Sequence, residues 1–318
     1  MVAINHPAGW LAQFWLRAVT ADWRQAGDRW TGLPAALRQP LEALLQGHDE
    51  LTAMAEIVIA SQLHFVYSAD QDWCQHAVLP LLDWTEPTRA RRTWDGFLTW
   101  GRASDPLLEM GLLAQLLTTA EHITDFSDDM RGQLYRHLGS VAIYSTINPV
   151  QRWLPQLTRA LDASHRAEWM TRFAWMLGSL PADVVEAQWS RWIRHYWADR
   201  LNGTPLALTD EEASALASWT VYLTDSFSDG VDCATQHPAS LAPHSRVLRA
   251  ITEDRISQTP TAVAQLLAHL LRGTQSPFYD CDDLHRIVVA LHQHLARTDT
   301  RGIIEQGVRL GCANAPDW

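Results

Sequence analysis

Apolar residues recur along nearly the whole chain at spacings of three and four, the period that places them on one face of an α-helix. Alternation of apolar and polar residues, the sign of a half-buried strand, is almost absent. The pattern predicts a succession of helices. Their expected ranges are 8–25, 34–46, 50–66, 70–82, 88–100, 105–123, 127–146, 149–161, 164–179, 182–201, 210–225, 244–257, 260–272, 282–296 and 300–310.

Residues typical of helix ends support these ranges. Three positions place a capping side chain before a proline that would begin a helix: Asn148-Pro149, Asp105-Pro106 and Thr259-Pro260. The run TDEE, residues 209–212, has the spacing of a capping box. The glycines expected to end helices are Gly203, Gly273 and Gly311.

The order helix, short turn, helix repeats with pairs of roughly 35–45 residues, close to the spacing of HEAT-like repeats. No sequence motif recurs at a fixed period. We therefore expect an all-α fold, an irregular helical-hairpin array of the HEAT-like α-solenoid type. It would form one helical domain over residues 1–318, with a weak hinge in the longest irregular stretch, 226–243.

The chain contains 16 tryptophans, and two of the expected helices are especially rich in aromatic residues. The stretch WDGFLTWG (94–101) holds Trp94, Asp95, Phe97 and Trp100, and Gly96 there predicts a close approach by another helix. In the helix over 182–201, a stripe at helical spacing consists of Trp189, Ile193, Tyr196 and Arg200, and Trp192 and Trp197 lie beside it. Both sets are interpreted as a packing signature, with a partner-binding surface as the alternative.

Charge and composition exclude several functions. The chain has 318 residues and a net charge of −11, which disfavours generic binding to nucleic acid. All 25 basic residues are arginines. Phosphate-loop, Schiff-base and kinase mechanisms that need a lysine are therefore impossible. The start shows no signal peptide and no stretch is long enough to span a membrane, so we expect a cytoplasmic protein.

Candidate chemistry is sparse. The four cysteines lie far apart, which favours reduced thiols over a disulfide framework. Cys281 and His285 form at most half a metal site, because His292 lies about 16 Å from Cys281 along a helix. The acidic runs 209–212 and 128–129 are typical of helix starts. We predict no catalytic, cofactor-binding or metal-binding residue.

Two arginine–histidine pairs raise the alternative of a helical nuclease of the HEPN type. Arg131 with His137, and Arg286 with His292, have the bare six-residue spacing of that motif. On a continuous helix this spacing turns the two side chains about 240° apart. Gly132 and Ile287 also stand where the motif has a polar residue.

Three stretches together resemble a known family: NHPAGWLAQFWL (5–16), RRTWDGFLTWGR (91–102) and QWSRWIRHYWADRLNGTPLALTDEEASALASW (188–219). They are similar to the uncharacterised C-terminal helical domain (domain of unknown function 4020) of bacterial anti-phage defence proteins that begin with a sirtuin-like NAD-binding domain. In that family the sirtuin-like part would consume NAD. The glycine-rich turn of that part is missing here, so no catalytic residue carries over.

The resemblance implies a non-catalytic interaction or regulatory domain, the sensor or assembly part of such a defence protein. Its partners would be proteins: a sirtuin-like NAD-binding domain in cis or in trans, a phage protein, or a second copy of the chain. No cofactor is expected for this chain, and neither a membrane nor a nucleic acid is an expected partner. The alternatives are the HEPN-like nuclease and a purely structural scaffold.

Overall fold

The structure is a computed structural model that describes residues 3–47, 49–241, 246–275, 278 and 280–318. Over these residues the chain is built from helices and turns and contains no strand, which confirms the predicted all-α fold. None of the helices in the described part is both long and apolar enough to cross a membrane.

The chain divides into two compact units, residues 1–147 and 148–318. The expected hinge, 226–243, lies inside the second unit; residues 242–243 of it lie outside the described residues, and the rest is not irregular throughout. Helix α16 (Phe227–Ala234) forms there because Phe227, Val231 and Ala234 recur at helical spacing and are all buried. Whether the two units together form one helical domain depends on how they join, so the expectation of one domain over the whole chain stays a prediction.

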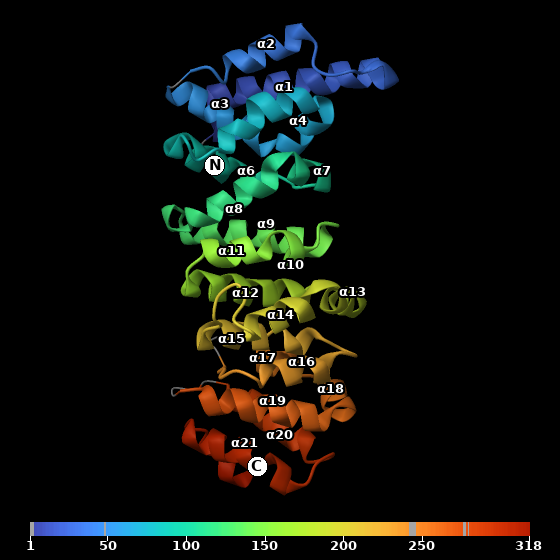
Figure 1. Cartoon of the computed structure of the whole chain (residues 1–318), viewed down its shortest axis with the longest axis vertical. Helices are drawn as coiled ribbons and strands as arrows, with labels where there is room; N and C mark the ends of the chain where they lie inside the picture. The colour runs from blue at the N-terminus through green and yellow to red at the C-terminus, as the bar shows by residue number, and fades with distance from the viewer. Residues whose placement is uncertain (1–2, 48, 242–245, 276–277, 279) are drawn as a thin grey trace. The chain divides into compact units, whose positions relative to one another are not determined.

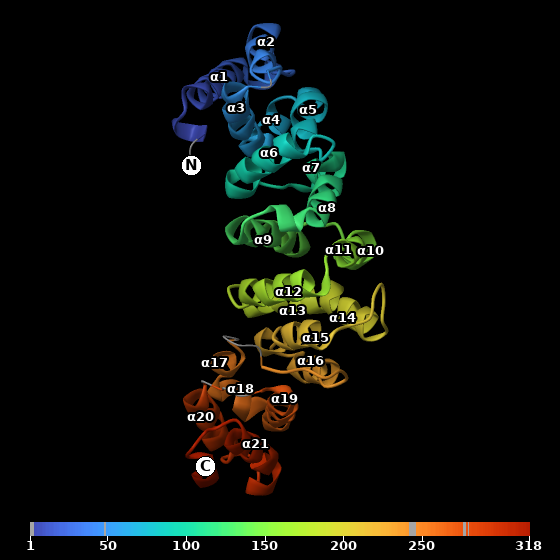
Figure 2. The same ribbon diagram turned by 90° about the vertical axis from the view of Figure 1, so that its left-hand side faces the viewer.

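The first unit is a set of helices in which each main helix packs on the next. Its helices are α1 (Pro7–Ala26), α2 (Ala35–Ala43), α3 (Glu50–Ser61), α4 (Leu63–Ala69), α5 (Gln71–Trp73), α6 (Pro87–Trp100), α7 (Asp105–Leu107), α8 (Leu113–Glu121) and α9 (Asp128–Tyr144). Helix α1 packs on α3, α3 on α6 and α6 on α9 (Figures 1 and 2).

Short turns of other helical types connect these helices. The 3-10 turns are η1 (Ala3–Asn5), η2 (Gly27–Arg29), η4 (Leu79–Leu82) and η6 (Ile123–Asp125), and the π-helical turns are η3 (Cys74–Val78) and η5 (Leu108–Leu112). The predicted ranges 70–82 and 105–123 are therefore helical but not continuous α-helices.

Gly96 lies where α6 crosses α3. A Cβ atom at this position would lie 2.5 Å from the carbonyl oxygen of Ile57 and 2.9 Å from its Cγ2. The predicted close approach of another helix is confirmed, and the neighbour is the α3 backbone at Ile57. Only glycine leaves room for two helix backbones at this distance.

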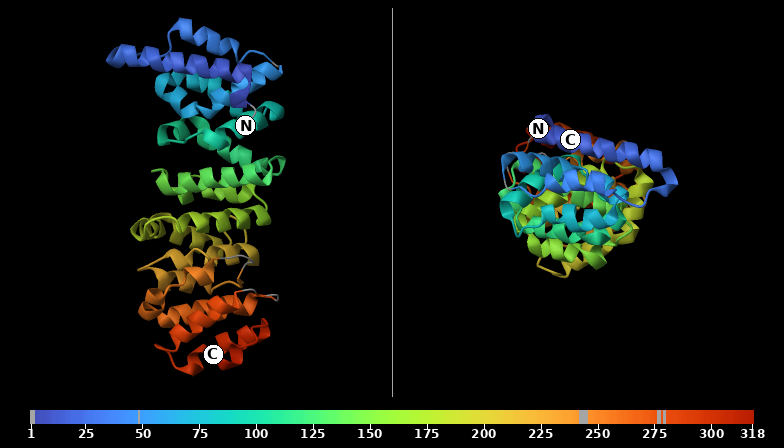
Figure 3. Two further views of the ribbon diagram at one scale, coloured as in Figure 1. Left: turned by 180° about the vertical axis from the view of Figure 1, so that it is seen from behind. Right: turned by 90° about the horizontal axis from the view of Figure 1, so that it is seen from above.

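The second unit repeats the same mode of packing. Its helices are α10 (Pro149–Arg152), α11 (Leu154–Ala160), α12 (Ala163–Leu177), α13 (Ala182–Gln188), α14 (Arg194–Leu201), α15 (Asp210–Ala217), α16, α17 (Val247–Ala250), α18 (Glu253–Gln258), α19 (Pro260–Gly273), α20 (Cys281–Leu291) and α21 (Arg297–Arg309). Helix α15 lies between α12 and α16, and α19 between α16 and α21 (Figures 1 and 3).

Three turns complete the second unit. They are the π-helical turn η7 (Trp189–Ile193) and the 3-10 turns η8 (Thr220–Tyr222) and η9 (Ala315–Asp317). Turn η7 joins α13 to α14, so the predicted helix 182–201 has one wide turn in its middle.

Two of the three predicted cap-and-proline starts differ in detail from the structure. Asn148 caps α10, accepting from the backbone amides of Val150 and Gln151, as predicted. Asp105 is the first residue of α7, whose N-cap position is Ser104, and its carboxylate accepts from the backbone amide of Thr146 at 2.9 Å. Thr259 makes no side-chain cap either, since its hydroxyl donates to the Arg255 carbonyl at the end of α18.

Candidate functional site

The aromatic residues of 94–101 divide between the core and the surface. Trp94 and Phe97 are fully buried and meet edge to face, with ring centroids 5.5 Å apart. The indole nitrogen of Trp94 donates to the Leu82 carbonyl at 3.0 Å. Asp95 lies on the surface, and Trp100, at the end of α6, is 39% exposed. Trp94 and Phe97 are therefore packing residues, whereas Asp95 and Trp100 face solvent.

The aromatic residues of 182–201 are all buried. The solvent-exposed fraction is 3% or less for each of Trp189, Trp192, Tyr196 and Trp197. At 100° per residue these four positions fall within an arc of about 140° on one side of a regular helix, which explains how one helical segment buries them all; the π-helical turn η7 lies among them. These four side chains form core contacts, including a ring contact between Trp189 and Trp197 at 6.0 Å. They are not available to a partner.

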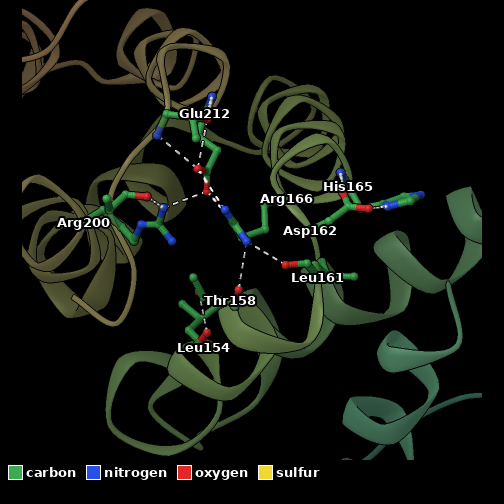
Figure 4. A network of polar contacts seen from close by, with 10 residues as sticks. Leu154, Thr158, Leu161, Asp162, His165, Arg166, Arg200 and Glu212 are labelled. Atoms are coloured by element: carbon green, nitrogen blue, oxygen red, sulfur yellow. Dashed lines mark hydrogen bonds and ion pairs between the residues drawn. The ribbon is translucent and has the colours of Figure 1, made fainter. Parts of the chain in front are cut away.

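A buried polar centre lies beside this aromatic core, at the contact of α12, α14 and α15 (Figure 4). Glu212 of α15 receives Arg166 Nε at 2.6 Å and Arg200 Nη2 at 2.7 Å on its Oε1. Its Oε2 accepts Arg166 Nη2 at 3.3 Å and the Thr209 amide at 3.1 Å. We call Arg166, Arg200 and Glu212 the arginine–glutamate centre.

Thr209 and Glu212 also form the predicted capping box of α15, which is confirmed. The structure therefore gives one carboxylate two functions that the sequence did not connect. It closes the first turn of α15, and it neutralises an arginine from α12 and another from α14. Arg166 further donates to the carbonyl oxygens of Leu161, at 2.6 Å, and Thr158, at 3.3 Å, which ties α11 to the same point.

The pKa of Glu212 is set by two opposing effects. Burial alone would raise the pKa, but the hydrogen bond from Arg166 and the charges of both arginines outweigh it, so the pKa is lowered. Glu212 is thus ionised near neutral pH. Because both Glu212 and Arg200 are fully buried, a dissolved substrate has no route to them. The arginine–glutamate centre joins helices α12, α14 and α15.

The first unit contains a second buried glutamate between arginines. Glu56 of α3 lies 2.7 Å from Arg89 and 3.5 Å from Arg92, both on α6. Its Oε2 accepts no hydrogen bond within the described structure. Burial raises the pKa of Glu56, and the charge and hydrogen bond of Arg89 offset this only in part.

The two arginine–histidine pairs that suggested a nuclease contact different groups. Arg131 pairs with Asp128 at 2.7 Å, whereas the imidazole of His137 bonds the Leu98 carbonyl at 3.1 Å. Burial lowers the pKa of His137.

In the second pair, the Arg286 guanidinium donates to the carbonyl oxygens of Ile251 and Leu248. His292 bonds the Thr300 hydroxyl at 2.6 Å. Each member of both pairs is thus held by its own partner.

The cysteines correct one sequence-based expectation. Cys281 and Cys312 form a disulfide, joining the start of α20 to the segment after α21, although reduced thiols were expected. Their separation of 31 residues gives no sequence signal, because the fold alone brings the two together. The bond removes Cys281 as a metal ligand. His285, its suggested companion, stacks on Trp318 at 5.2 Å.

Clefts open on both units. One of about 630 Å³ in the second unit is lined by small and acidic residues, among them Glu168, Asp210 and Glu211. In the first unit, a cleft of about 490 Å³ includes His137 and Tyr144. A groove of about 350 Å³ runs beside α1; we call it the α1 groove. Its lining is Ile4, Gln13, Leu16, Arg17, Thr20, Val58, Ser61, Gln62, Phe65 and Trp100.

Helix α1 also exposes large apolar side chains next to this groove. Trp10 is 58% exposed, Phe14 59% and Leu11 45%. We call these three residues the α1 face. The opposite side of the helix is buried against α3, through residues that include Ala12 and Leu16. Sequence reasoning missed the α1 face, although its signal is visible: α1 is apolar on two sides, whereas a packed surface helix needs only one.

The comparisons with known proteins place a family match on the second half of the chain. Residues 141–296 match the model of a family described as a domain of unknown function, DUF4020. Of the three stretches that carry the resemblance, 188–219 lies inside this range, and 5–16 and 91–102 lie outside it. No curated protein and no solved structure shows a significant match to the chain.

Proposed function

We propose that this chain is a non-catalytic helical interaction domain that binds a protein partner through the α1 face. The observation that carries the proposal is the exposure of Trp10, Leu11 and Phe14 on one helix. Large apolar side chains gathered on a surface are typical of protein–protein contacts, and tryptophan is enriched among the residues that dominate binding. The packed helices behind α1 then serve as the rigid support of this surface.

The biological setting is a further part of the proposal. The match of residues 141–296 to DUF4020 supports the helical-domain part of the resemblance. The place beside a sirtuin-like NAD-binding domain in bacterial anti-phage defence rests on the resemblance of the three stretches alone. In this setting the chain is a HEAT-like array that senses infection or directs assembly, in the cytoplasm, while NAD consumption belongs to the sirtuin-like part. Its partner is that domain, in cis or in trans, or a phage protein.

A binding assay with matched variants tests the proposal. The chain is co-expressed with a sirtuin-like domain from the same bacterium, and the complex is measured by size-exclusion chromatography with light scattering. Trp10→Ser with Phe14→Ser should abolish the complex. Tyr144→Ser, which removes a 70% exposed aromatic side chain from α9 of the same unit, should leave it intact.

Two results would contradict the proposal. One is a complex that survives the double substitution in α1 with unchanged affinity. The other is hydrolysis of NAD or RNA by the purified chain alone, since a non-catalytic domain should release neither nicotinamide nor nucleotides.

A further inference from the structure

The α1 groove has apolar walls and a single charged residue. Ile4, Leu16 and Val58 line it together with the rings of Phe65 and Trp100. Most of its polar side chains are bonded within the chain. Gln13 donates to the Ile4 carbonyl at 3.2 Å, Thr20 to the Leu16 carbonyl at 3.0 Å, and Ser61 to the Val58 carbonyl at 2.6 Å. These groups offer an incoming partner little polar recognition.

Arg17 is the exception. It is exposed, and no described residue forms an ion pair or hydrogen bond with it. It follows Trp10 by seven residues and Phe14 by three, so it lies on the same side of α1, between the α1 face and the groove. A surface that combines exposed aromatic rings, an apolar groove and an exposed arginine favours an apolar partner that places a carboxylate beside this arginine.

We propose that the α1 groove binds an amphipathic helix of a partner protein. Apolar side chains of that helix enter the groove beside Trp100, its apolar face covers Trp10 and Phe14, and an aspartate or glutamate of the helix pairs with Arg17. This inference rests on the proposed function and gives the partner its chemistry.

The size of the groove fits side chains inserted from a helix lying on the surface. Its volume of about 350 Å³ takes a few apolar side chains and excludes a whole helix, which is about 10–12 Å across. Partner residues at positions i, i+3, i+4 and i+7 form one stripe, the usual way in which a helix docks in a groove. A carboxylate beside this stripe would reach Arg17 at the edge of the groove.

Selection from a displayed peptide library tests the charge requirement. The library consists of helical peptides about 16 residues long, with leucine or phenylalanine at i, i+3, i+4 and i+7 and all other positions randomised. The wild-type chain should enrich aspartate or glutamate beside the stripe, and the Arg17→Glu chain should enrich arginine or lysine there. The best wild-type peptide should lose at least about tenfold in affinity on Arg17→Glu, by fluorescence anisotropy.

Three further variants separate charge from folding and from general effects. Arg17→Lys keeps the charge and should keep most of the affinity. Arg136→Glu makes the same charge change at an exposed position on α9 and should leave binding unchanged. Trp100→Ser should weaken binding by removing one wall of the groove.

Several outcomes overturn the inference. One is that the wild-type and Arg17→Glu chains select peptides of the same charge. Another is that Trp100→Ser leaves the affinity for the selected peptide unchanged. A third is that a correctly folded chain enriches no peptide from the library. A dimer of the chain that Trp10→Ser dissociates would assign the groove to a second copy. Peptides whose affinity falls on substitution of Trp10 and Phe14 but is unchanged by Arg17→Glu would refute the acidic helix. The proposed interaction function would then still hold.

Discussion

Two helix–helix contacts in this chain bury a glutamate beside two arginines, and they use it in opposite ways. At the contact of α12 and α15, Glu212 accepts hydrogen bonds on both oxygens, and its pKa is lowered. At the contact of α3 and α6, Glu56 is close to Arg89, but one oxygen accepts no bond in the described structure, and its pKa is raised.

In these two contacts the pKa is lowered where both carboxylate oxygens accept hydrogen bonds and raised where one oxygen accepts none. Burial opposes ionisation in both cases. At Glu212 the hydrogen bonds and charges of the two arginines outweigh the effect of burial, and at Glu56 they do not. The α3–α6 contact also contains the close approach at Gly96, whereas the α12–α15 contact contains the charged network.

The largest expected effect is that of removing the charge at Glu212. Glu212→Gln leaves Arg166 and the fully buried Arg200 without a counter-charge, and this should lower the free energy of unfolding by about 3–5 kcal/mol. Urea unfolding monitored by circular dichroism measures the loss. Glu211→Gln, an exposed neighbour in the same helical turn, is the control and should change stability little. Equal stabilities of the two variants would show that the network contributes nothing.

A smaller but still large effect is expected at the α3–α6 contact. Gly96→Leu should overpack the contact, because even a Cβ atom would lie 2.5 Å from the Ile57 carbonyl oxygen, and the cost should be about 1–3 kcal/mol or more. Gly302→Leu is the matched control. Gly302 lies in α21, where a Cβ atom would meet nothing within 4 Å, so leucine there should stabilise by about 0.5–1 kcal/mol. Melting temperatures that move the same way would refute the packing argument.

The difference between the two contacts also shows how far the sequence could be interpreted. Helix positions followed from periodicity, and Gly96 and the capping box at Thr209 were predicted because each needs only local information. The arginines that Glu212 neutralises could not be predicted, since Arg166 lies 46 residues away in the chain. Glu56, the disulfide of Cys281 and the α1 groove were missed for the same reason: each depends on segments that only the fold brings together.

The interior of 182–201 shows a different limit. Its aromatic stripe was recognised, but the wide turn at Trp189–Ile193 was not, because nothing in residue type distinguishes a π-helical turn from an α-helical one. Aromatic content alone does not separate surfaces from cores: the α1 face was not predicted, and a partner-binding surface was kept as the alternative for tryptophans that are buried.

The smallest expected effect concerns pH, and it has opposite signs at the two glutamates. Glu56 has a raised pKa, so above the ordinary value of 4.5 the folded chain holds more protons than the unfolded chain. Its contribution to stability therefore falls as the pH rises through this window. Glu212 has a lowered pKa, so its contribution is present above 4.5 and is lost as the pH falls toward the folded value.

Unfolding free energies of the wild type, Glu56→Gln and Glu212→Gln between about pH 7 and pH 4 test this opposition. Near neutral pH, Glu56→Gln should cost at most about 1 kcal/mol, since the partly exposed arginines can turn to water. As the pH falls toward 4.5, the wild type should gain stability relative to Glu56→Gln. Below pH 4.5, the wild type should lose stability relative to Glu212→Gln. Parallel pH profiles for the two pairs would mean that hydrogen bonding does not distinguish the two carboxylates.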